Sequence, residues 1–108
     1  MPEITAPAHI RKRNGDVVAF DAEKITVAIQ KANLESTDKT FTKRQLDALT
    51  KSVVSHISDQ DAPGVEYIQD AVERVLIKNN YASTAKAYIL YRAAHTRIRE
   101  AEVDLMDI

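Results

Sequence analysis

The chain has 108 residues, a formal net charge of −1, 44% hydrophobic and 29% charged residues, and no cysteine. These values are typical of a single globular domain with one core. The lack of cysteine excludes disulfides, thiolate metal ligands and cysteine nucleophiles, and the balanced charge argues against a general nucleic-acid binder. No signal-peptide pattern and no apolar run near the roughly 20 residues of a membrane span occur, so we expect a cytoplasmic protein.

The first predicted element is a β-hairpin centred on Asn14 and Gly15. Strand-like runs lie on both sides of this pair, and Asn-Gly favours a type I′ turn, which needs positive φ at both central residues. A two-residue loop of this kind would pair Ile10 with Ala19.

Four helices are predicted after the hairpin. Asp21 is a good N-cap for the first, and Thr42 with Gln45 has the spacing of a capping box for the second. The third ends near Asn79-Asn80, a plausible left-handed cap. The helices are expected over residues 22–33, 43–58, 65 to about 78, and 83–101.

Because a lone two-stranded hairpin is marginal in water, it must lie against the helices. The sequence therefore predicts an α+β fold in which an N-terminal β-hairpin caps a four-helix bundle. A third short strand could come from the breaks between helices, although no pattern shows one. We expect residues 1–8 to be a flexible lead-in, 9–101 to be the domain, and 102–108 to be a tail or the start of a linker.

No residue pattern predicts catalysis or a metal site. The three histidines have no ligand spacing within one helix, and no serine stands in a nucleophile-elbow motif. Neither glycine is followed by Lys-Ser or Lys-Thr, as in a phosphate-binding loop. We expect a domain that is not an enzyme by itself.

The concentrated feature is the basic run of Arg11, Lys12 and Arg13. One interpretation is an edge strand that is only solvated and defended by charge. Lys24 favours another, because it lies three residues after Asp21, where a capping box has Glu or Gln and where a cation opposes the helix dipole. The free amides of a first helical turn bind anions, so these cations together fit a polyphosphate.

The fourth predicted helix carries Tyr88, Tyr91 and Arg92. The tyrosines can pack in the bundle while Arg92 pairs with an acid such as Glu73. Alternatively, tyrosine or arginine lies beside a base or a phosphate. The residues alone leave both interpretations open.

Four segments in order, residues 10–15, 20–25, 65–73 and 85–92, resemble the ATP-cone family, and the match runs from residue 9 to about 99. ATP-cones are the allosteric activity domains of ribonucleotide reductases. The resemblance implies that bound ATP switches the reductase on and dATP switches it off, by changing subunit association with a copy of the chain or another subunit. Mg²⁺ can accompany the nucleotide. Residues 88–92, 97–101 and 105–107 look most like the anaerobic, glycyl-radical class and hence a ribonucleoside-triphosphate reductase. An oxygen-dependent or cobalamin-dependent reductase is the alternative.

The resemblance also implies roles for individual residues. Cationic side chains would lie near the phosphates, the Asn-Gly pair would shape the turn, and an isoleucine would border the base. Val18 and Ala93 stand where some members have glutamate and lysine, respectively. The implied nucleotide-binding residues are Ile10, Lys12, Arg13, Asn14, Gly15, Lys24, Val65, Gln69 and Arg92.

Two other functions compete with nucleotide binding. The first is a helical protein-interaction module whose basic strand is merely solvated. The second is a small DNA-binding domain that uses the basic strand, which the balanced charge disfavours.

Overall fold

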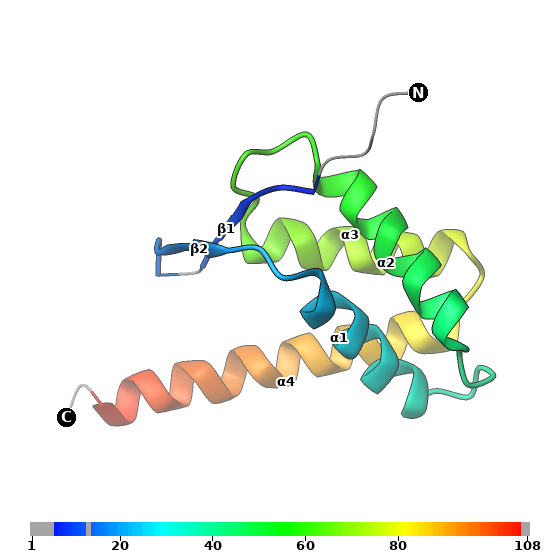
Figure 1. Cartoon of the computed structure of the whole chain (residues 1–108). Helices are drawn as coiled ribbons and strands as arrows, with labels where there is room; N and C mark the ends of the chain where they lie inside the picture. Colours follow the sequence, from blue (N-terminus) through cyan, green and yellow to red (C-terminus); the bar gives the residue numbers. More distant parts are fainter. Residues whose placement is uncertain (1–5, 13, 107–108) are drawn as a thin grey trace.

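The computed structural model describes residues 6–12 and 14–106, with side chains described up to residue 94. Over these residues it has a two-stranded antiparallel sheet followed by four helices, which confirms the predicted α+β fold (Figure 1). The last helix runs further than expected, through much of the predicted tail. The elements are β1 (His9–Arg11), β2 (Val17–Ala19), α1 (Ala22–Leu34), α2 (Lys43–Ile57), α3 (Val65–Lys78) and α4 (Ala82–Met106).

The register of the hairpin differs from the predicted one. Ile10 pairs with Val18, not with Ala19. At the loop end of the hairpin, the N–H of Lys12 donates to the carbonyl of Asp16 at 2.8 Å. Since side chains alternate between the two faces of a sheet, this shift by one residue changes which residues lie opposite each other.

The hydrogen bonds of the loop account for the shifted register. Gly15 has a φ of 93°, and its N–H donates to the carbonyl of Lys12 at 2.9 Å. The side chain of Asn14 accepts from the N–H of Asp16 at 3.0 Å. These bonds are typical of a three-residue hairpin loop, so the predicted type I′ turn is wrong.

A short segment before α3 pairs with the free edge of β1. The N–H of Arg11 donates to the carbonyl of Pro63 at 2.9 Å, and Arg11 forms a parallel bridge with Gly64. A single bridge has no periodic sequence pattern, and for this reason sequence analysis found no third strand. The bridge ties the hairpin to the start of α3.

The ends of the helices follow the predicted signals. The side chain of Asp21 accepts from the N–H of Glu23 at 3.0 Å, and Thr42 forms the expected capping box with Gln45. After α3, Asn80 has a φ of 66°, which confirms the predicted left-handed cap. Local chemistry therefore fixes where these three helices begin or end.

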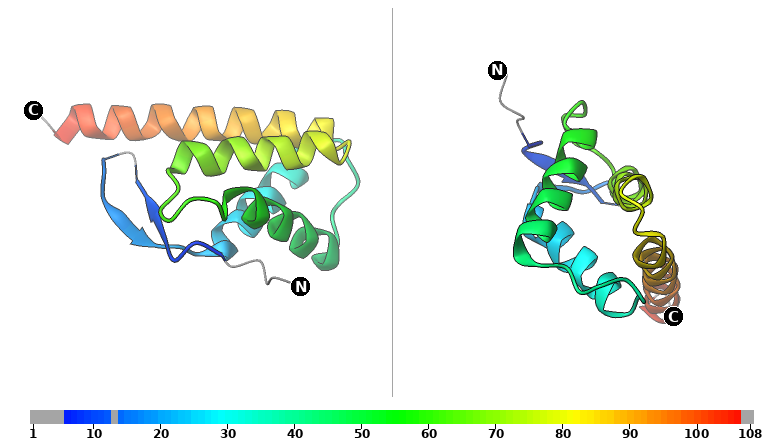
Figure 2. Two further views of the ribbon diagram at one scale, coloured as in Figure 1. Left: turned by 90° about the horizontal axis from the view of Figure 1, so that it is seen from above. Right: turned by 90° about the vertical axis from the view of Figure 1, so that its right-hand side faces the viewer.

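The core lies between the helices, with α1 and α3 each packed against both α2 and α4 (Figure 2). The C-terminal half of α4 projects beyond α3 on the side of the hairpin. None of the described helices combines the length and the apolar character that crossing a bilayer requires. The most deeply buried apolar side chains are Ile29, Val53, Ile57, Val72, Val75 and Leu76.

A buried asparagine ties α1 to the loop that follows it and to α4. Asn33 is 3% exposed, and its side-chain oxygen accepts from the N–H of Phe41 at 2.8 Å. Its amide nitrogen donates to the carbonyl of Lys39 at 3.0 Å and to the hydroxyl of Thr84 at 3.4 Å. The amide of Asn33 thus joins three segments of the chain.

We predict that Asn33→Ala lowers the free energy of unfolding by about 1–3 kcal/mol, because it leaves the buried N–H of Phe41 without an acceptor. Urea unfolding followed by circular dichroism measures the change. The exposed Gln30 on the same helix provides the control, and Gln30→Ala is expected to stay within about 0.5 kcal/mol. Equal effects of the two substitutions would contradict the structural role of Asn33.

Candidate functional site

A half-open cavity of about 130 Å³ lies where the hairpin, α1, α3 and α4 meet, and we call it the hairpin cavity. Most of its walls are apolar, and four of its side chains carry a polar or charged group: Asp21, Lys24, Gln69 and Tyr88. An apolar cavity with a few polar groups is the usual form of a small-molecule site. The lining residues are Ile10, Ala19, Phe20, Asp21, Lys24, Ile25, Ala28, Val65, Ile68, Gln69, Val72 and Tyr88.

Helical periodicity builds one wall of the hairpin cavity. Val65, Ile68, Gln69 and Val72 stand at i, i+3, i+4 and i+7 on α3, so they share one face of the helix. Across from them, Tyr88 of α4 is 4% exposed, which agrees with the interpretation that it packs in the bundle. Burial raises the pKa of the Tyr88 hydroxyl, so this group stays protonated at neutral pH.

The side chain of Gln69, in this wall, has a polar atom that lacks a hydrogen-bond partner. Its Oε1 is buried and has no hydrogen-bond partner among the described residues. Its neighbours along the α3 stripe, Ile68 and Val72, offer no side-chain donor. A buried acceptor without a partner costs about 1–3 kcal/mol, and such an atom in a cavity indicates that a donor is missing.

Lys24 brings a cation to the edge of the same cavity. It is exposed and lies in the first turn of α1, three residues after the N-cap Asp21. A positive charge there opposes the helix dipole and costs about 0.3–1 kcal/mol. An anion beside Lys24 and the first-turn amides would remove this conflict.

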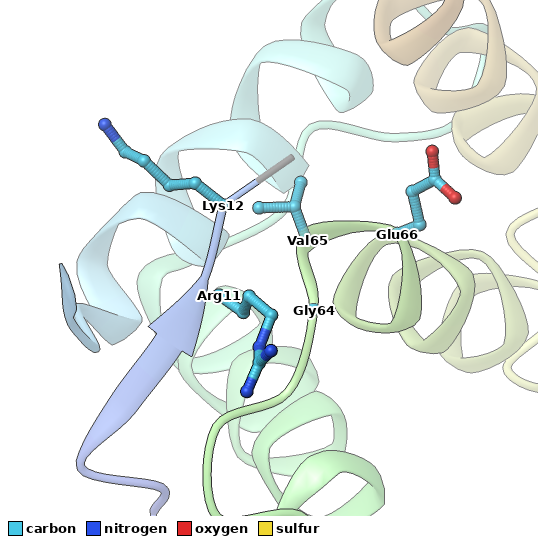
Figure 3. Close-up of a pocket in the computed structure, with 5 residues that line it drawn as sticks. All are labelled: Arg11, Lys12, Gly64, Val65 and Glu66. Atoms are coloured by element: carbon cyan, nitrogen blue, oxygen red, sulfur yellow. The ribbon is translucent and has the colours of Figure 1, made fainter. Parts of the chain in front are cut away.

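A second, wider pocket of about 330 Å³ lies beside the first and shares Val65 with it; we call it the outer pocket (Figure 3). It lies at the start of α3, whose N-cap Gly64 offers no side chain to the free amides. Arg11 and Lys12 extend from β1 in different directions, as successive strand residues do. The described part of the basic run therefore does not converge on one point.

The structure brings four of the predicted nucleotide-binding residues together. Ile10, Lys24, Val65 and Gln69 line the hairpin cavity, although they come from β1, α1 and α3. Lys12 lines the outer pocket instead. The predicted site thus spans two adjoining pockets.

Three predicted residues belong to the hairpin loop. Asn14 and Gly15 shape the turn, as expected, through the bonds described above. Arg13 lies outside the described residues. Asn14 and Gly15 line neither of the two pockets described above.

Arg92 is held in ion pairs between α4 and α3. Its guanidinium donates to Asp70 at 2.9 Å and to Glu73 at 2.6 Å, and its side chain is 19% exposed. These ion pairs agree with one of the two interpretations left open by the sequence, in which Arg92 pairs with an acid such as Glu73. Arg92 does not line the hairpin cavity or the outer pocket.

Sequence reasoning did not assign several cavity residues to the site. Phe20, Ile25, Ile68 and Val72 form apolar walls, and Tyr88 was left between packing and binding. The helical spacing on α3 could have identified Ile68 and Val72 as cavity residues, because they share a face with Gln69. Among the described residues, no three histidine or acidic side chains gather as metal ligands would.

Comparison with known proteins assigns the chain to a family. The sequence matches the ATP cone domain over residues 8–97, so the chain belongs to the ATP-cone family of nucleotide-binding regulatory domains.

Its relatives include a vitamin B12-dependent ribonucleoside-diphosphate reductase of Thermoplasma acidophilum, 42% identical over 90% of this chain and 13% of the relative. They also include ribonucleoside-diphosphate reductase alpha subunits of Chlamydia muridarum (37% identical, 86% of this chain, 10% of the relative) and Treponema pallidum (34%, 86% and 12%). The chain thus spans only 10–13% of the length of these relatives.

These names correct one expectation. The resemblance to the anaerobic class implied a ribonucleoside-triphosphate reductase, whereas the matching relatives are diphosphate reductases. Two of the three segments used for the subclass, 97–101 and 105–107, lie outside the residues whose side chains are described. The family assignment does not depend on them.

We predict that Lys24→Glu raises the stability of the free chain by about 1 kcal/mol, because it replaces a cation by an anion in the first turn of α1. Thermal unfolding would shift upward by several degrees for a chain of this size. Lys43→Glu, in the first turn of α2, is the matched control and should give a similar gain. A loss of stability with Lys24→Glu alone would show that Lys24 makes a stabilising contact in the free chain.

Proposed function

We propose that this chain binds ATP or dATP in the hairpin cavity and thereby regulates a ribonucleotide reductase, without chemistry of its own. The observation that carries the proposal is an apolar cavity with an unmet acceptor inside and a cation at its edge, in a member of the ATP-cone family. The apolar part suits a base, and the charged edge suits phosphates.

The hairpin cavity is smaller than a purine base requires, so the base would enter it only in part. Its volume is about 130 Å³. A cavity of about 150 Å³ with apolar walls accepts a benzene ring. Because the hairpin cavity is half-open, a flat fused-ring base can enter by one edge while its sugar stays near the surface.

The phosphates would lie along the edge formed by Lys24 and the first turn of α1. Lys12, in the adjoining outer pocket, and Arg13 would add positive charge from the hairpin. Hydrogen bonds to charged groups contribute about 1.5–3 kcal/mol each, so a few of them suffice for micromolar affinity. Mg²⁺ would enter bound to the triphosphate, since no metal-ligating cluster occurs among the described side chains.

Regulation would act through the elements that surround the cavity. ATP and dATP differ by one hydroxyl group, and a ligand shifts a conformational equilibrium only by its different affinity for the two states. The hairpin and α4 both line the cavity, and α4 projects beyond the bundle (Figure 2). A change in their spacing would alter the surface available to a second copy or to another reductase subunit.

We predict that ATP binding survives Lys43→Ala and is weakened about 10- to 100-fold by Lys24→Ala, the loss expected for one charged hydrogen bond. Isothermal titration calorimetry of the wild-type chain and both variants measures this. Thermal unfolding is the second readout, since ligand at 100 times its dissociation constant adds about 2.7 kcal/mol of stability. An unchanged melting temperature at saturating ATP would favour the interaction module with a solvated basic strand.

A further inference from the structure

We propose that Asp38 is a positioning residue for the nucleotide site, because it caps the start of α4 from the loop between α1 and α2 and so holds Tyr88 in the wall of the hairpin cavity. This inference rests on the proposed function. Asp38 lines neither of the two pockets, and its loop lies at the end of the bundle away from the hairpin (Figure 1).

The first argument is a helix cap that comes from a distant part of the chain. The N–H of Ala85 donates to the carbonyl of Tyr81 at 2.9 Å, so the N–H of Thr84, one residue earlier, has no partner within α4. It donates instead to Oδ2 of Asp38 at 2.9 Å, and the Thr84 hydroxyl donates to the same oxygen at 2.7 Å. Asp38 and Thr84 are 46 positions apart in the sequence, and Thr84 is 0% exposed.

A second contact beside this cap joins the same loop to the same turn of α4. The N–H and the hydroxyl of Thr37 both donate to Oγ of Ser83, each at 2.9 Å. Two successive residues of the loop therefore hold two successive residues of the helix. These contacts restrain the rotation of the helix end as well as its position.

The third argument is the place of Tyr88 on α4. Tyr88 is 4% exposed, lines the hairpin cavity and lies about one turn after Thr84. About one turn after Tyr88, the guanidinium of Arg92 is bound to Glu73 of α3 at 2.6 Å. The turn that carries Tyr88 thus lies between two polar anchors, one to the α1–α2 loop and one to α3.

Loss of the cap would loosen this cavity wall from the far end of the bundle. Without the carboxylate of Asp38, the buried N–H of Thr84 has no acceptor, which favours states in which the first turn of α4 opens to water. An N-cap shifts the equilibrium of a helix end by about 2- to 30-fold. A ligand that needs the closed wall then binds more weakly, in proportion to the fraction of molecules in which the wall is closed.

The test measures ATP affinity by calorimetry in the wild type and three variants. We expect Asp38→Ala to bind ATP about 3- to 30-fold more weakly than the wild type. Asp38→Asn should stay within about twofold of the wild type, because asparagine caps helices as well as aspartate does. Val53→Ala is the matched control: it removes buried methyl groups from α2, which contributes no residue to the hairpin cavity, so it lowers stability but should leave ATP affinity unchanged.

Hydrogen exchange followed by NMR is the second measurement, and it needs no ligand. The amide of Tyr88 should exchange about 2- to 30-fold faster in Asp38→Ala than in the wild type, whereas amides in the middle of α2 should change less. Asp38→Asn should match the wild type. Saturating ATP should slow the exchange of the Tyr88 amide in Asp38→Ala, because the coupling between the ligand and the closed wall is reciprocal.

A milder variant keeps the test decisive if Asp38→Ala does not fold. Ser83→Ala removes the acceptor of the exposed Thr37 and leaves the cap of Asp38 on Thr84 in place. ATP binding weakened at least about twofold would then support the role of the loop, and unchanged binding would overturn it.

The outcomes separate this inference from the proposed function. Wild-type ATP affinity in Asp38→Ala, or an equal loss in Val53→Ala, would overturn the role of Asp38 and leave the nucleotide site intact. A loss in Asp38→Asn as large as in Asp38→Ala would also overturn it, because the charge and not the capping bonds would then be the cause. Failure of the wild type to bind any nucleotide would overturn the proposed function itself, while exchange of the Tyr88 amide would still test the cap.

Discussion

The packing of a very small hairpin against a stable bundle is the constraint on which the site depends. Two strands of three residues cannot persist alone in water, so contacts with the helices must hold them. Ile10 and Phe20 pack against the core, and the N–H of Arg11 reaches the carbonyl of Pro63. The hairpin covers the helices without filling the space beneath it, and that space is the hairpin cavity. An element with so few contacts opens and closes at low cost, which suits a part that must respond to a ligand.

The first turns of α1 and α3 both border the hairpin cavity, in a chain with a net charge of −1. The acidic Asp21 and Glu66 line the two pockets together with basic side chains. The first turn of α1 carries Lys24, and the first turn of α3 begins at Gly64, which has no capping side chain. Lys12 adds a cation from the hairpin side. Val65 lines both pockets, so the two helix ends contribute to one continuous region. The electrostatic character of the site thus comes from the backbone arrangement as much as from the number of basic residues.

The opposite wall of the cavity is held in place by charges that are already paired. Arg92 joins α4 to α3 through Asp70 and Glu73, and Tyr88 lies one turn before it on α4. The pair with Glu73 is partly buried and the pair with Asp70 is exposed, and both join the two helices near the cavity. In the described structure, Arg92 therefore supports the wall on which a base would rest, while Lys24 is the cation at the cavity's edge. A ligand that altered the spacing of α3 and α4 would have to act against these ion pairs.

The sequence by itself determined the helices and their ends. Asp21, the Thr42–Gln45 capping box and Asn80 act through bonds to residues a few positions away, so a linear pattern contains all the partners involved. Tertiary structure decided the rest. The register of the hairpin depended on the hydrogen bonds of its loop, and the pairing of β1 with Pro63 depended on segments about 50 residues apart. That Gln69 lacks a partner could be learned only from the packed molecule, because burial and an unmet hydrogen bond depend on every surrounding element and not on neighbours in the chain.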